Sequence, residues 1–115
     1  MKHIFSLLAL LLFISGVCFA QDKNIKTDTI KVDGLCEKCK KRIENAAYIK
    51  GVKRADWNVQ TKQLVVIYSS KTSLETIEES IAHAGHDTGG VLASDEDYKK
   101  LPYCCAYKNV VGVGH

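Results

Sequence analysis

The chain has 115 residues, of which 25% are charged, and a formal net charge of +3. This length is enough for one small domain with a thin core. The mild basic surplus excludes the strongly basic composition of a typical nucleic-acid-binding domain.

The first twenty residues have the pattern of a secretory signal peptide. A basic start, Met1–His3, is followed by an apolar run, Ile4–Val17, and then by the small residues Cys18 and Ala20. The run is too short and wrongly flanked for a retained membrane helix, so we expect cleavage after Ala20 and a periplasmic or secreted protein. A lipoprotein acylated at Cys18 is the alternative, but Val17 stands where such a site needs a small residue.

Removal of residues 1–20 leaves 95 residues with fifteen basic and thirteen acidic side chains, a net charge of +2. Four cysteines remain, Cys36 and Cys39 in one pair and Cys104 and Cys105 in another. In an oxidising compartment such pairs can close as disulfides. An even number of cysteines is equally compatible with metal binding.

The first two elements of the domain follow a polar lead-in over residues 21–26. Alternating polar and apolar residues predict a strand over 29–33, with Ile30 and Val32 facing inward. A helix is predicted to begin near Cys39 and to end at Gly51, which suits a left-handed cap. The apolar stripe of this helix consists of Ile43, Ala46 and Ala47.

A hairpin is predicted next. Residues 54–59 and 64–68 alternate like strands and are joined by a polar turn over 60–63. Trp57 and Tyr68 fall on the inward face, whereas Val65 and Ile67 fall on the opposite face. We expect the valine-rich C-terminal residues to cover this second face.

A second helix is predicted over residues 74–84, because Thr72 and Glu75 have the spacing of a capping box and Gly85 suits its end. A short fourth strand is expected over 88–92, although Gly89-Gly90 weakens the pattern. Beyond it, residues 94–101 suggest one or two helical turns with Ser94 and Asp97 at capping distance.

The order strand, helix, strand, strand, helix, strand is a split βαβ unit repeated. It predicts an α+β domain over residues 27–92, with two helices on one face of a four-stranded antiparallel sheet. Residues 93–115 form a C-terminal extension that carries the Cys104-Cys105 pair.

The Cys36-Glu37-Lys38-Cys39 motif lies where the first strand ends and the first helix begins. This spacing allows two sulfurs to converge on one ion, and thiolates are the ligands that Cu(I) and Zn(II) prefer. Redox dithiols use the same spacing at helix starts. A thioredoxin-like protein needs a different strand order and a proline facing the dithiol, whereas the single proline here is Pro102.

In this context the chain resembles the heavy-metal-associated domain family, which includes copper chaperones, metal-binding domains of metal-pumping ATPases and periplasmic mercury-binding proteins. The resemblance covers roughly residues 26–92. The matching stretches are Ile30-Lys31-Val32, Cys36-Glu37-Lys38-Cys39, Gly51-Val52, Val66-Ile67-Tyr68 and Ile81-Ala82-His83-Ala84-Gly85-His86.

The resemblance implies a ferredoxin-like βαββαβ fold with Cys36 and Cys39 as metal ligands. It places His86 in the loop beside them, as a candidate further ligand that is also compatible with a capping or surface role. Gly34-Leu35 abuts Cys36 directly, whereas the family usually has one more residue here, so the loop is expected to be shorter or re-registered. The stretch Leu101–Cys105 resembles a tail of secreted bacterial members.

Together these features predict a non-enzymatic, monomeric, exported protein that carries a soft metal ion, foremost Cu(I), with Hg(II), Zn(II) or Cd(II) as alternatives. Its expected partner is a metal-transporting ATPase or another thiol-bearing metal protein, not nucleic acid and not a membrane. A thiol–disulfide exchange protein and a disulfide-stapled structural domain are the alternative functions.

The sequence is compatible with more than one role for the second cysteine pair. Twelve residues separate Leu92 from Cys104, and extended they reach about 40 Å, enough to bring the tail to the Cys36–Cys39 loop. Cys104 and Cys105 are therefore candidate additional ligands. A local disulfide between them, or an exposed tail, explains the residues equally well.

Overall fold

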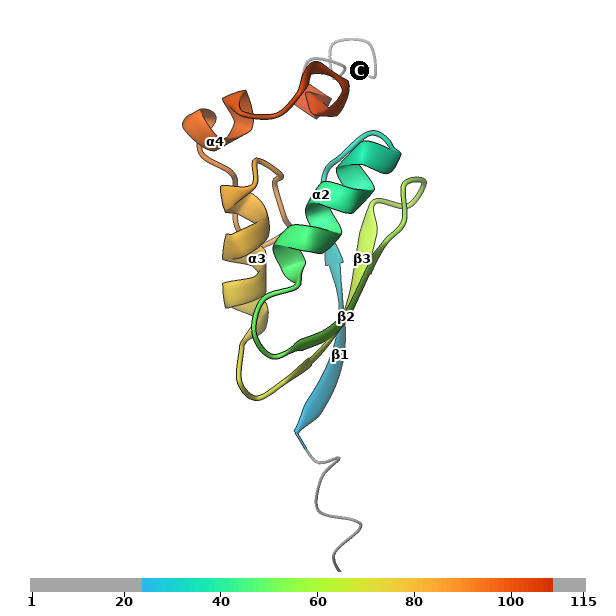
Figure 1. Cartoon of the computed structure of the whole chain (residues 1–115), viewed down its shortest axis with the longest axis vertical. Coiled ribbons are helices and arrows are strands. Elements are labelled where there is room, and N and C mark those ends of the chain that lie inside the picture. The colour runs from blue at the N-terminus through green and yellow to red at the C-terminus, as the bar shows by residue number, and fades with distance from the viewer. Residues whose placement is uncertain (1–23, 109–115) are drawn as a thin grey trace, which may run out of the picture.

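The computed structural model describes residues 24–108, in which three antiparallel strands and two long helices form an α+β domain. The sheet has the order β1-β3-β2, and α2 and α3 cover one of its faces (Figure 1). The elements are β1 (Ile25–Lys31), α2 (Glu37–Ala47), β2 (Val52–Trp57), β3 (Gln63–Ser69), α3 (Leu74–His83), α4 (Asp95–Lys99) and the 3-10 turn η1 (Tyr103–Cys105).

The predicted hairpin is present, and β3 lies between the other two strands, where Leu64 pairs with Ile30 on one side and with Trp57 on the other. The turn is stabilised by Asn58, whose Oδ1 accepts hydrogen bonds from the N–H groups of Gln60 and Thr61. Val59 lies in this turn and not in β2, which ends at Trp57. The turn therefore begins two residues earlier than the alternation predicted.

The core lies between the sheet and the two long helices. Side chains from β3 and from both helices are fully excluded from solvent, as the alternating and helical patterns predicted. The buried residues at its centre are Val32, Ile43, Trp57, Leu64, Val66, Ile77 and Ile81.

The predicted fourth strand over residues 88–92 is wrong. Only a single bridge, between Val32 and Thr88, pairs this segment with the end of β1. The chain turns away immediately afterwards, because the Thr88 N–H and Oγ1 both donate hydrogen bonds to the Val91 carbonyl oxygen. Gly89 and Gly90 favour this turn over a strand.

Two element starts also differ from the predictions. Strand β1 begins at Ile25, inside the segment predicted to be lead-in. Helix α3 is capped by Ser73 and not by Thr72, because the Ser73 Oγ accepts the hydrogen bond from the Thr76 N–H. The hydroxyl of Thr72 is buried and has no hydrogen-bond partner among the described residues. Gly51 adopts the predicted positive φ, at 98°, but it does not cap α2, which ends at Ala47 with Tyr48 as its C-cap.

The extension folds back over one end of the domain. Ser94 caps α4 as predicted, by accepting a hydrogen bond from the Asp97 N–H. The following turn, η1, lies close to the first turn of α2 (Figure 1). Leu101 and Cys105 pack into the main core, so this segment is part of the domain and not a loose tail.

None of the helices within residues 24–108 is long and apolar enough to cross a membrane. The predicted signal peptide, the cleavage after Ala20 and Cys18 lie outside the described residues, as does the valine-rich end that was expected to cover Val65.

Candidate metal site

The first cysteine pair occupies the start of α2. Cys36 is the N-cap residue and Cys39 lies in the first turn, which brings their sulfur atoms to 3.8 Å. Cys36 is half-buried, whereas Cys39 is completely buried among core residues. Cys39 is therefore part of the hydrophobic core as well as of the cysteine motif.

The loop before α2 rests on Trp57. The indole N–H of Trp57 donates a 3.0 Å hydrogen bond to the carbonyl oxygen of Val32, at the start of the loop. A Cβ at Gly34 would lie 3.1 Å from both the Trp57 ring and the Cβ of Cys39. Glycine at this position therefore allows the loop to pack closely against the ring, which fixes the position of Cys39.

The electrostatic surroundings of Cys36 favour its thiolate form. The backbone N–H of Cys39 has the largest effect in lowering the pKa of Cys36, and the N–H of Lys38 adds to it, against a smaller opposing effect of burial. Neither N–H makes a well-aligned capping hydrogen bond to the sulfur. The effect is that of a helix N-terminus on a nearby anion.

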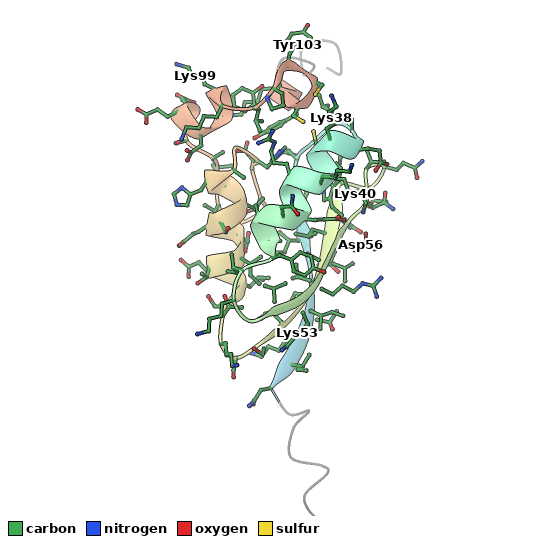
Figure 2. The ribbon with its side chains drawn as sticks, in the orientation of Figure 1. Lys38, Lys40, Lys53, Asp56, Lys99 and Tyr103 are labelled. Carbon is green, nitrogen blue, oxygen red and sulfur yellow. The ribbon has the colours of Figure 1, made fainter. Side chains whose placement is uncertain are left out.

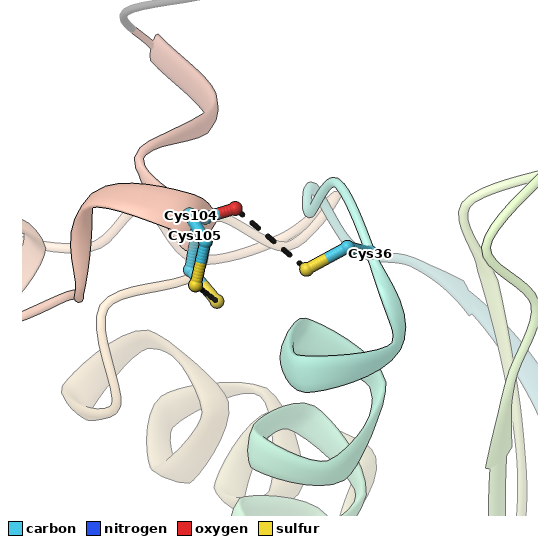
Figure 3. Close-up of side chains that lie close together, drawn as sticks. All are labelled: Cys36, Cys104 and Cys105. Carbon is cyan, nitrogen blue, oxygen red and sulfur yellow. Dashed lines mark hydrogen bonds between the residues drawn. The ribbon is translucent and has the colours of Figure 1, made fainter.

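The second cysteine pair lies directly opposite the first. The sulfur atoms of Cys36, Cys104 and Cys105 all lie within 4.8 Å of one another. Figure 3 shows Cys36 pointing from the loop before α2 toward η1, where its sulfur is 3.7 Å from the carbonyl oxygen of Cys104. All four described cysteines are free thiols, and the adjacent sulfurs of Cys104 and Cys105 are 4.0 Å apart.

The two tail cysteines differ in exposure. Cys104 is exposed, whereas Cys105 is completely buried. Burial raises the pKa of Cys105 far above its ordinary range, and the neighbouring Cys39 thiol raises it further. The cluster therefore combines one thiol that ionises readily, Cys36, with one that is kept protonated in the absence of an ion.

His86 is buried and is not a member of the described cysteine cluster. Its Nδ1–H donates a 2.7 Å hydrogen bond to the carbonyl oxygen of Asp33, while its Nε2 has no hydrogen-bond partner among the described residues. Burial lowers the pKa of His86, so the ring is neutral. The structure thus gives His86 a role in holding the start of the cysteine loop.

The basic side chains near the thiols differ in whether they are paired with acidic residues. Lys40 is tied to the sheet, because its Nζ donates hydrogen bonds of 2.6 Å to Glu44 and of 2.7 Å to Asp56 (Figure 2). These bonds, foremost that to Asp56, raise the pKa of Lys40. Lys38 and Lys41 are exposed on the same helix. Only the latter two are available to an approaching molecule.

Tyr107 is important for the site and was missed by the sequence analysis. Its hydroxyl donates a 3.0 Å hydrogen bond to the carbonyl oxygen of Gly85 and accepts one of 2.9 Å from the N–H of Asp87. The ring stacks on His86, with centroids 5.7 Å apart. Tyr107 is part of no periodic pattern beyond Pro102, so the sequence carried no signal for this contact.

Comparison with known proteins assigns the fold to a family. The heavy-metal-associated domain model matches residues 29–87. Among solved structures, the CopZ metallochaperone is 32% identical with a TM-score of 0.53, and the alignment covers 55% of this chain and 98% of CopZ. No curated protein matches the chain.

Two further structures extend the likeness. Oxidized MerP from Ralstonia metallidurans CH34 is 29% identical with a TM-score of 0.54, over 56% of this chain and 94% of MerP. The N-terminal domain of a potential copper-translocating P-type ATPase from Bacillus subtilis is 25% identical with a TM-score of 0.53, over 56% of this chain and 84% of that domain. The residues that the family model matches include the Cys36–Cys39 loop. The chain therefore belongs to the heavy-metal-associated domain family.

Proposed function

We propose that the protein holds one soft metal ion, foremost Cu(I), between Cys36 and Cys39 and passes it to another thiol-bearing protein. The observation that carries this proposal is the pair of free sulfurs 3.8 Å apart at the start of α2. Cu(I) is preferred because thiolates select it and because a similar structure is the Cu(I)-loaded domain of a potential copper-translocating ATPase. Hg(II), Zn(II) and Cd(II) have affinity for the same ligands, and MerP is among the similar structures.

The distance between the sulfurs constrains the coordination. With metal–sulfur bonds of about 2.3 Å, two ligands lie about 3.8 Å apart in a tetrahedral complex, about 4.0 Å in a trigonal one and about 4.6 Å in a linear one. The observed 3.8 Å fits three or four ligands directly. Linear binding requires Cys36, the less buried of the two, to move outward by less than ~1 Å.

The unequal burial of the two ligands suggests the order in which they release the ion. When a partner's thiolate adds to an ion held by the loop pair, it does so on the exposed side, the bond to Cys36 breaks first, and Cys39 leaves last. The buried position of Cys39 favours this order, since solvent and partner reach Cys36 first. The exposed Lys38 and Lys41 would attract a partner with an acidic surface, and a metal-transporting ATPase is the partner class that we favour.

We further propose that the mature protein acts in the periplasm or outside the cell, after cleavage behind Ala20. This rests on the basic start, the apolar run and the small residues of the first twenty positions. An exported carrier would acquire its ion in an oxidising compartment, where a bound ion also protects the two thiols from oxidation.

Competition with a Cu(I) chelator tests the site assignment. To isolate the loop pair, the test uses a background in which Cys104 and Cys105 are both serine. In this background Cys36→Ser and Cys39→Ser should each lower the Cu(I) affinity by ~100-fold or more, since loss of a direct ligand should cost at least as much as loss of an outer-shell partner. Unchanged affinity in both variants would remove Cys36 and Cys39 from the site.

Thiol–disulfide exchange remains a second candidate because two dithiols face each other and the Cys36 pKa is lowered. Such a protein would exchange Cys36–Cys39 and Cys104–Cys105 disulfides and would not need a metal. Titration in glutathione buffers under anaerobic conditions separates the two functions. A carrier should keep Cu(I) throughout the reducing range, whereas an exchange protein should show a disulfide potential near that of its compartment.

A further inference from the structure

The C-terminal extension is held against the site by several independent contacts. Leu101, Cys105 and Tyr107 are buried, and all three lie in the same core as the helices. Tyr107 adds two hydrogen bonds to the loop after α3, and its ring packs edge-on against Tyr98 at 5.1 Å. The Cys104-Cys105 turn is therefore positioned by the fold.

The sulfur geometry on the extension also fits a metal ion. Cys104 and Cys105 are 4.0 Å apart, the spacing expected for two ligands of a trigonal complex with bonds of about 2.3 Å. Cys36 completes a triangle in which no two sulfurs are more than 4.8 Å apart. Cys36 also lies 3.8 Å from Cys39, so it belongs to both the loop pair and this triangle.

We propose that Cys36, Cys104 and Cys105 form a three-thiolate site for a soft metal ion, which shares Cys36 with the loop pair. The proposal rests on the proposed function and adds a second ligand set to it. The ion changes set without leaving Cys36: bonds to Cys104 and Cys105 form as the bond to Cys39 breaks. Each thiol that binds releases its proton to the buffer, Cys39 takes one up, and no electron is transferred.

Because Cys36 belongs to both ligand sets, the extension competes with the partner protein for the bound ion. Its thiols occupy the side of Cys36 from which an external thiolate would approach. A thiol held on a short segment of the same chain acts at an effective concentration on the order of mM. An external monothiol should therefore remove the ion efficiently only at about that concentration, and a partner must displace η1 to receive it.

Serine variants are the suitable test, and truncation after Leu101 is not. Truncation would also remove Tyr107 and leave the buried Gly85 carbonyl oxygen and the Asp87 N–H without their partner. Cys104 is exposed, so Cys104→Ser should leave the fold unchanged. Cys105→Ala, which adds no polar atom to the core, accompanies Cys105→Ser to separate packing from ligation.

The first measurement counts sulfur ligands by X-ray absorption of the reduced, Zn(II)-loaded protein. We expect three or four sulfurs at about 2.3 Å in the natural sequence, and two when both tail cysteines are replaced. An equal sulfur count in both proteins would overturn the three-thiolate site. Two sulfurs in the serine-tail variant would at the same time leave the Cys36–Cys39 function standing.

The second measurement compares the Cu(I) affinities of Cys36→Ser and Cys39→Ser with the natural tail and with the serine tail, as a mutant cycle. With the natural tail, Cys39→Ser should lose less than ~10-fold, because the triangle remains, whereas Cys36→Ser should lose ~100-fold or more. With the serine tail, both variants should lose ~100-fold or more. An equal loss for Cys39→Ser in both backgrounds would contradict the triangle, and no loss in any variant would contradict the proposed function itself.

Discussion

Cys36 and Cys39 are three residues apart, yet their surroundings differ in every respect that governs metal exchange. Cys36 is half-buried and faces the N–H groups at the start of α2, which lower the pKa of its thiol. Cys39 is enclosed by the core and by Gly34, whose missing side chain makes room for it. The pair thus combines an accessible thiolate with a fixed one, an arrangement suited to holding an ion that must later leave.

This difference predicts unequal effects on stability. Without metal and under reducing conditions, Cys39→Ser should lower the free energy of unfolding by ~1–3 kcal/mol, because it places a hydroxyl in an apolar site. Cys36→Ser should change it by less than ~0.5 kcal/mol. Urea unfolding measures both values, and Cys39→Ala serves as the control for polarity. Equal, negligible effects would mean that Cys39 is not enclosed as described.

His86 predicts how stability depends on pH. Burial holds the pKa of His86 below its ordinary value, so between that lowered pKa and about 6.5 the unfolded chain binds more protons than the folded one. Stability should therefore be retained above pH ~6.5 and decline below it, by at most ~1.4 kcal/mol per pH unit.

The measurement is urea unfolding at a series of pH values from about 7.5 to about 5.5, a range that brackets the pKa of an ordinary histidine. His86→Gln, whose amide can still donate to the Asp33 carbonyl oxygen, should flatten the profile. His83→Gln is the matched control, because His83 is exposed and should leave the decline in place. A profile that is equally steep in the His86→Gln variant would exclude His86 as its source.

For helices and strands, the sequence was most informative where an element buries one face and exposes the other to solvent. The stripe of α2 and the alternation in β3 are confirmed, whereas α2 ends at Ala47, before the predicted glycine cap. The fourth strand failed because local turn bonds between Thr88 and Val91 outweigh weak alternation. The site was predictable as far as Cys36 and Cys39, whereas the docking of η1 depends on Tyr107, which belongs to no pattern.

The start of α3 provides a test at this scale. Ser73→Ala should cost ~0.5–2 kcal/mol of stability, because its Oγ accepts the Thr76 N–H at the helix start. Thr72→Val is the matched control and should be neutral or stabilising, since the buried Thr72 hydroxyl makes no hydrogen bond to described residues. Thermal unfolding of both variants measures this, and the reverse order would assign the cap to Thr72.

For the molecule as a whole, the extension closes the domain at the end where the cysteines lie. Three-stranded pairing leaves the segment after α3 free to turn toward α4, and η1 then meets the start of α2 (Figure 1). Tyr103, which Figure 2 shows pointing away from the domain, is the most exposed large hydrophobic side chain of this region, at 90%. A molecule that approaches the loop before α2 must therefore pass η1.

The leader gives a separate whole-molecule prediction. The exported protein should begin at Gln21, because Ala20 ends the leader and Val17 is unsuited to the position before an acylated cysteine. Intact-mass measurement of the mature protein distinguishes the two outcomes. A chain that starts at a lipid-bearing Cys18 would contradict this prediction and place the protein on a membrane surface.

The central claim is that the thiols bind a soft ion, and native mass spectrometry combined with thiol counting tests it most directly. The reduced protein is supplied with Cu(I), and the Cys36→Ser variant is treated identically as the control. We predict one bound Cu(I) per chain in the natural sequence, four titratable thiols after the ion is removed, and loss of the ion in the variant. A natural chain that takes up no Cu(I) under these conditions, or that retains it equally well without Cys36, would contradict the claim.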